Sequence, residues 1–101
     1  MTAEELNNIA NEHRQHGRFN EAQSAAEEAL ICAQANNDKK QEARALTIVG
    51  HLARSAADYP GAAAYYHQAF DLYQEQGDTS GIANVTGNIG YVHRALGNFD
   101  K

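Results

Sequence analysis

Three of the five arginines in the chain recur at one regular interval, at Arg14, Arg54 and Arg94. A guanidinium group is a planar fork that pairs with a carboxylate, often through two parallel hydrogen bonds. Most acidic residues fall at other positions, so the repeated arginines predict a locally positive surface that binds an acidic peptide or a carboxylate-bearing segment. An equally open interpretation is that each arginine only forms a salt bridge with a neighbouring helix or caps a helix end, where the helix dipole favours it.

Metal and thiol chemistry have weaker support. His13 and His16 lie three residues apart, a spacing that can hold a metal on a helix, but zinc needs more ligands and no Cys or carboxylate set joins them. We therefore expect packed or surface histidines, no metal and no cofactor. Cys32 is the single cysteine, which excludes an internal disulfide and a multi-cysteine zinc site. A small buried side chain is expected there rather than a reactive thiol.

Composition limits the remaining functions. The chain has 101 residues, the size of one domain, with 8 Lys+Arg against 13 Asp+Glu and a net charge of −5. This balance argues against binding to nucleic acid or to an anionic membrane surface. No apolar run approaches a membrane span, and the acidic N-terminus is unlike a signal peptide, so a cytoplasmic location is expected. No nucleophile, phosphate-loop or metalloprotease motif is present, which predicts that the protein is not an enzyme.

An internal repeat organises the chain and predicts the elements that carry the arginines. When the chain is aligned with itself at the interval of the arginines, Phe19, Tyr59 and Phe99 fall together, and so do Gly50 and Gly90. Apolar residues follow helical spacing within each copy. The sequence therefore predicts an all-α fold in one domain, with repeats at about 1–38 and 39–77 and half a repeat at 78–101. Five helices are expected at about 2–16, 19–36, 39–56, 59–76 and 79–97.

Single residues and short motifs also predict where helices begin and where two helices pack closely. Thr2 with Glu5, and Asp38 with Gln41, have the spacing of a capping box. Asp78 can cap the helix that follows Gly77. Gly50 and Gly90 each cost about 1 kcal/mol relative to alanine inside a helix, so their shared repeat position predicts close helix packing.

The second repeat carries the residues of a known helical family. Leu46, Val49, Gly50, Ala62, Tyr66 and Ala69, with the turn ADYPGA, resemble the tetratricopeptide repeat. The period of 40 is similar to the longer variant of Leu-Gly-Asn-type repeat proteins and kinesin light chains. The resemblance implies a right-handed α-solenoid of antiparallel helix pairs with about 2.5 repeats. It also implies a non-enzymatic scaffold that binds a protein or peptide partner in a concave groove.

Helix geometry and the family pattern together select the residues that would face this groove. The expected face lies about 100° from the core stripe of the first helix of each repeat. Its members are polar or aromatic side chains, namely Asn7, Asn11, Arg14, Arg44, Thr47, His51, Arg54, Asn84, Asn88, Tyr91 and Arg94.

The last helix suggests a second surface. Its apolar residues, together with one that follows it, form an expected self-association face of Ile82, Val85, Ile89, Val92, Leu96 and Phe99. One preceding neighbour is not expected to bury them all. This face predicts either a homo-oligomer or a fragment of a longer repeat array. A third interpretation is a peptide-sensing segment of a larger signalling protein.

Overall fold

The computed structural model describes residues 1–97, which form five α-helices. They are α1 (Ala3–Gln15), α2 (Phe19–Ala35), α3 (Lys39–Ser55), α4 (Tyr59–Gln76) and α5 (Thr79–Gly97). No strand occurs within these 97 residues. The predicted all-α solenoid is confirmed, and each predicted helix boundary lies within one residue of the observed one.

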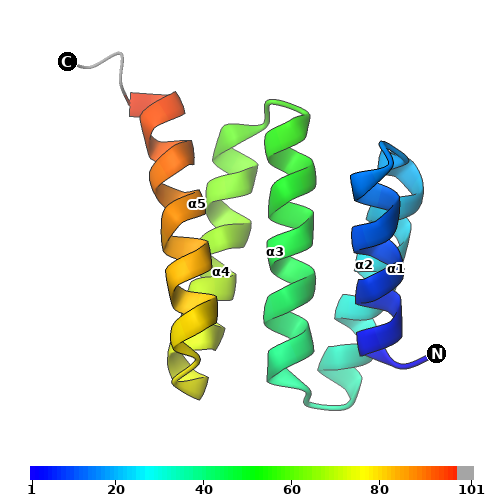
Figure 1. Cartoon of the computed structure of the whole chain (residues 1–101). Coiled ribbons are helices and arrows are strands. Elements are labelled where there is room, and N and C mark those ends of the chain that lie inside the picture. Colours follow the sequence, from blue (N-terminus) through cyan, green and yellow to red (C-terminus); the bar gives the residue numbers. More distant parts are fainter. Residues whose placement is uncertain (98–101) are drawn as a thin grey trace.

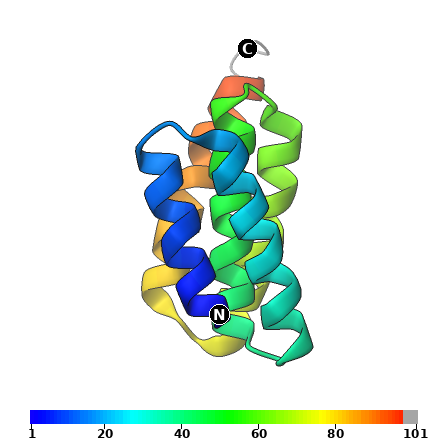
Figure 2. The same cartoon turned by 90° about the vertical axis from the view of Figure 1, so that its right-hand side faces the viewer.

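The helices pack in chain order. Each contacts the next one along the chain, and α1 also contacts α3. Figure 1 shows the chain advancing across the molecule from α1 and α2 to α5. In Figure 2, α1 and α5 lie toward one side and α2 and α4 toward the other. The first helix of each pair therefore contributes to a common face, as a helical repeat solenoid requires.

The turns between helices share one backbone conformation. Gly17, Asn37, Ala57 and Gly77 all adopt positive φ angles, between 56° and 76°. They recur at equal intervals along the chain, so every turn in its described part reverses direction in the same way. Ala57 takes this left-handed conformation although its Cβ makes it less favourable than for glycine.

Side chains cap the helix starts as the sequence predicts. The Glu5 backbone N–H donates to the Thr2 hydroxyl over 3.1 Å, and the Thr2 backbone N–H donates to the Glu5 carboxylate over 2.8 Å. Asp38 accepts from the Gln41 backbone N–H over 3.3 Å, and Asp78 caps α5 by accepting from the backbone N–H of Gly81 over 3.0 Å. The Gln41 side chain does not complete a capping box, because it accepts a hydrogen bond from Asn7 instead.

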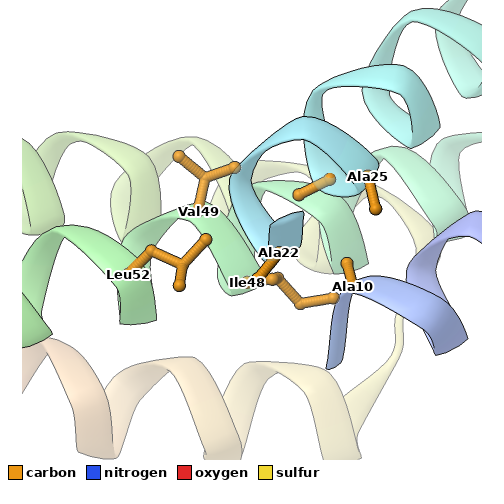
Figure 3. Packing of buried hydrophobic residues seen from close by; sticks show 7 residues of the cluster. Ala10, Ala22, Ala25, Ile48, Val49 and Leu52 are labelled. Carbon is orange, nitrogen blue, oxygen red and sulfur yellow. The ribbon is translucent and has the colours of Figure 1, made fainter. Parts of the chain in front are cut away.

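Two hydrophobic clusters hold the helices together. The first joins α1, α2 and α3 and contains Ala10, Ala22, Ala25, Ala26, Ile48, Val49 and Leu52. Figure 3 shows its larger side chains on α3 facing alanines of α1 and α2. Alanine on the facing helices permits close approach of the backbones. The second cluster centres on Tyr66 of α4, which is fully buried, and includes Val85 and Val92 of α5.

Tyr66 explains one of the two mid-helix glycines. A Cβ atom built on Gly50 would lie 2.7 Å from Cε1 of the Tyr66 ring, so α3 needs a glycine there. A Cβ atom on Gly90 would meet nothing within 4 Å in the described structure. The prediction of close packing at a mid-helix glycine is therefore confirmed at Gly50 and is wrong at Gly90.

This difference gives a matched pair of substitutions. Gly50→Ala should lower the free energy of unfolding by about 1 kcal/mol, because overpacking costs more than helix propensity returns. Gly90→Ala should raise it by about 0.5–1 kcal/mol, because only the propensity gain remains. Urea titrations followed by circular dichroism measure both values. Equal shifts in the two variants would contradict the tight contact at Tyr66.

The predicted self-association face is wrong in two of its members. Val85 and Val92 are fully buried, because they pack on the Tyr66 cluster of α4. Ile82 and Ile89 are half-buried, and Leu96 is 38% exposed. Phe99 lies outside the described residues.

Among the described helices, none has both the length and the apolar character needed to cross a membrane.

Candidate functional site

A polar groove runs across the face shared by the first helices of the pairs. It encloses about 310 Å³ and receives side chains from α1, α3, α4 and α5. Six of its lining residues belong to the set selected from the sequence. Its lining residues are Asn11, Arg14, Arg44, Thr47, Ile48, His51, Tyr73 and Asn84.

Two members of the predicted groove set are buried, and only one of them, Thr47, lines the groove. Asn7 is completely buried, and its Nδ2 donates to the Gln41 backbone carbonyl over 3.1 Å and to the Gln41 side-chain oxygen over 2.9 Å. Thr47 is 8% exposed, and its hydroxyl donates to the Ala43 carbonyl over 2.9 Å. The prediction that Asn7 faces a ligand is wrong, because the close contact of α1 with α3 covers it. Thr47 does line the groove, although its hydroxyl turns back onto its own helix.

The arginines around the groove are held by neutral oxygens. Arg14 donates from Nε and Nη2 to Oδ1 of Asn11, over 3.1 and 2.7 Å. Arg44 of α3 donates to Oδ1 of Asn8 on α1 over 2.5 Å, and more weakly to Oε1 of Gln41 over 3.5 Å. An amide oxygen orients a guanidinium without cancelling its charge. These contacts differ from the salt bridges expected under the alternative interpretation of the arginines.

A second arginine cluster links α3 to α5 beside the groove. Arg54 donates to Oδ1 of Asn88 over 3.2 Å, and its guanidinium carbon lies 5.0 Å from the centroid of the Tyr91 ring. Asn88 in turn donates to Oδ1 of Asn84 over 3.0 Å. Tyr91 remains 46% exposed, so this cation–π pair has an accessible face. Arg94 is exposed and lines no part of the groove.

His51 forms part of the groove wall and reaches the core beneath it. Its Nδ1 lies 2.7 Å from the Tyr66 hydroxyl, and the two rings meet edge to face at 5.5 Å. Burial lowers the pKa of His51 to about 4, and the positive charges of Arg14 and Arg54 add to this effect. His51 is therefore neutral at pH 7, which adds no positive charge to the arginines.

The lowered pKa predicts an acid sensitivity. Unfolded His51 binds a proton below its ordinary pKa of 6.5, whereas folded His51 does so only below about 4. The stability is thus complete above pH 6.5 and falls as the pH drops from 6.5 to about 4, by at most about 1.4 kcal/mol per pH unit. Urea denaturation at several pH values measures this slope. His51→Gln should flatten the curve in that window, and an unchanged curve would contradict this role.

Sequence reasoning missed some of the residues that build the groove. Tyr73 lines it but is absent from the set of residues selected from the sequence. Asn8 positions Arg44, and a usable signal existed because Asn8 and Asn88 occupy the same repeat position and both accept from an arginine. Gln41 also accepts a hydrogen bond from Arg44, but no shared repeat position marks it in the sequence.

The histidine pair considered for metal binding has another partner. Nδ1 of His13 accepts a hydrogen bond from Nε of Arg18 over 2.8 Å. Within residues 1–97, His, Cys, Asp and Glu side chains do not gather in groups of three or more that could hold a metal ion.

Comparison with known families identifies the first helix pair. Residues 2–38, which include α1 and α2, match the model of the family described as tetratricopeptide repeat. No curated protein matches the chain.

Proposed function

We propose that this protein binds an acidic segment of a partner protein in its polar groove, because residues 2–38 match the tetratricopeptide repeat family. Tetratricopeptide repeats are protein–protein interaction modules, and they present an extended concave surface to their partners. The finer proposal concerns the chemistry of the ligand. A carboxylate-bearing peptide is the ligand class that matches the arginines lining the groove. The proposal includes the absence of enzymatic activity.

One observation supports this proposal above all. The hydrogen bonds of Arg14, Arg44 and Arg54 all go to amide oxygens of Asn or Gln. A guanidinium group has five N–H donors, so each arginine keeps donors for a ligand after making these bonds. Arginines that are already oriented lose less side-chain entropy when a carboxylate binds.

A pair of matched peptides tests the proposal. One labelled peptide is rich in Asp and Glu, and the other has Asn and Gln at the same positions. Fluorescence polarisation should detect binding of the acidic peptide alone, and raising the salt from about 0.05 to 0.5 M should weaken it through screening. Equal binding of both peptides would reject an electrostatic groove.

Self-assembly through α5 has less support as a function. The burial of Val85 and Val92 removes the centre of the surface on which it depended. Ile82, Ile89 and Leu96 keep some exposed area. We therefore favour a partner in the groove over assembly of identical chains.

A further inference from the structure

An apolar face lies between α1 and α2, the two helices nearest the viewer in Figure 2. Two adjoining hollows of about 430 and 620 Å³ share Met1, Leu6 and Glu28 as lining residues. The floor also includes Ile9, Ile31 and Cys32. Ile31, within α2, is 67% exposed, and Met1, at the N-terminus, is 81% exposed, so large apolar side chains border both hollows. We call this surface the end face.

The equivalent surface of the second helix pair shows what packs against such a face. The repeat alignment places Ile9 on Val49 and Ala25 on Tyr65. Val49 belongs to the cluster that packs on alanines of α2, and Tyr65 packs against the same cluster. An α-helix thus covers the equivalent surface one repeat further along the chain. The end face is the counterpart, in the first repeat, of this helix-covered surface.

The end face differs from its covered counterpart in charge. Glu12 stands at the repeat position of Leu52, which is buried. Glu21 and Glu28 line the hollows where the second pair has Gly61 and Gln68. Neither Lys nor Arg lines either hollow. Covering this face with a helix that brings no positive charge would bury carboxylates without partners, which is costly.

We propose that the end face binds an amphipathic helix of a partner protein, with lysine or arginine flanking its apolar stripe. The stripe fills the hollows over Ile9 and Ile31, and the basic flanks pair with Glu21 and Glu28. A second copy of this chain fits less well, because two end faces would oppose carboxylate to carboxylate. This site is separate from the arginine groove and does not depend on the function proposed for it.

A designed peptide is the probe. It has about 18 residues, with leucine at i, i+3, i+4 and i+7 spacing and lysine beside the stripe. A second peptide carries glutamate in place of each lysine. Fluorescence polarisation should give binding of the lysine peptide and at least tenfold weaker binding of the glutamate peptide. Equal affinities would overturn the proposal.

Variants of the protein locate the binding. The double variant Glu21→Lys/Glu28→Lys should weaken binding of the lysine peptide about tenfold, since it replaces attraction with repulsion. Glu27→Lys makes half of this charge change, on an exposed neighbour that lines neither hollow, and it should leave the affinity unchanged. If Glu27→Lys weakens binding of the lysine peptide as much per substituted glutamate as the double variant does, the proposal fails. Arg14→Gln/Arg44→Gln should bind this peptide normally, which separates the end face from the groove.

Cys32, expected to be buried, is only partly buried and provides a local readout. It is the single thiol of the chain and lines the larger hollow. Bound lysine peptide should slow the reaction of this thiol with a maleimide, and an unchanged rate would overturn the proposed location. Sedimentation equilibrium without peptide should give the same oligomeric state for the original protein and for Glu21→Lys/Glu28→Lys. Assembly that these changes alter would identify a second copy as the occupant and reject the basic helix.

Discussion

Tyr66→Ala should lower the free energy of unfolding by about 3–5 kcal/mol, the range for truncating a large aromatic side chain in a core. Tyr66 is fully buried, joins α3 to α4, and bonds to His51 through its hydroxyl. Small domains have about 5–15 kcal/mol of stability in total. The midpoint of thermal unfolding should therefore fall by at least about 12 °C. Differential scanning calorimetry measures this shift.

Tyr66→Phe is the matched control. It keeps the ring against Gly50 and removes only the hydroxyl that meets His51. Its cost should be about 1 kcal/mol, the size of one lost hydrogen bond. A loss in Tyr66→Ala no larger than in Tyr66→Phe would mean that the ring does not hold α3 and α4 together.

Arg14→Gln/Arg44→Gln should weaken binding of the acidic peptide by about 100-fold or more. Each hydrogen bond between charged groups contributes about 1.5–3 kcal/mol, and every 1.4 kcal/mol is a factor of ten in Kd. Both arginines line the groove, one from α1 and one from α3. Isothermal titration calorimetry gives the two affinities directly.

Arg18→Gln is the control for net charge. Arg18 is exposed at the turn before α2, bonds to His13 and lines no part of the groove. Removing it lowers the positive charge of the protein without touching the groove, so the affinity should change less than twofold. A loss in Arg18→Gln comparable to that of the double variant would show that overall charge governs binding rather than the groove.

The helices can be predicted from the sequence almost to the residue because their determinants are local. The apolar stripe of each helix, and caps such as Thr2 and Asp78, act within a few residues of one another. The repeat correctly predicts a turn at Ala57, although nothing in the chemistry of this residue favours the left-handed conformation that it adopts.

The surfaces are harder to predict because they depend on how helices approach one another. Helical periodicity places Asn7 on the groove face, but the contact between α1 and α3 buries it under Gln41. The same periodicity predicts Val85 and Val92 at an open interface, but both are fully buried in the cluster that contains Tyr66 of the preceding helix. A single helix pattern contains neither the distance nor the angle between two axes. Six groove residues can nevertheless be selected, because the repeat places them at matching heights on successive helices.

Most contacts join helices that follow one another along the chain, and this pattern also shapes the order in which the chain folds. Nine residues of α3 are buried, against two of α5, and α3 lies between both hydrophobic clusters. Contacts close in sequence need little loop-closure entropy, so chains of this kind fold within microseconds to milliseconds. We expect a nucleus formed by α3 with α2 or α4, and growth outward from it one helix at a time. On this pathway α1 and α5 join last and leave first, so the acidic end face and the Arg54–Tyr91 cluster are completed only in the final steps of folding.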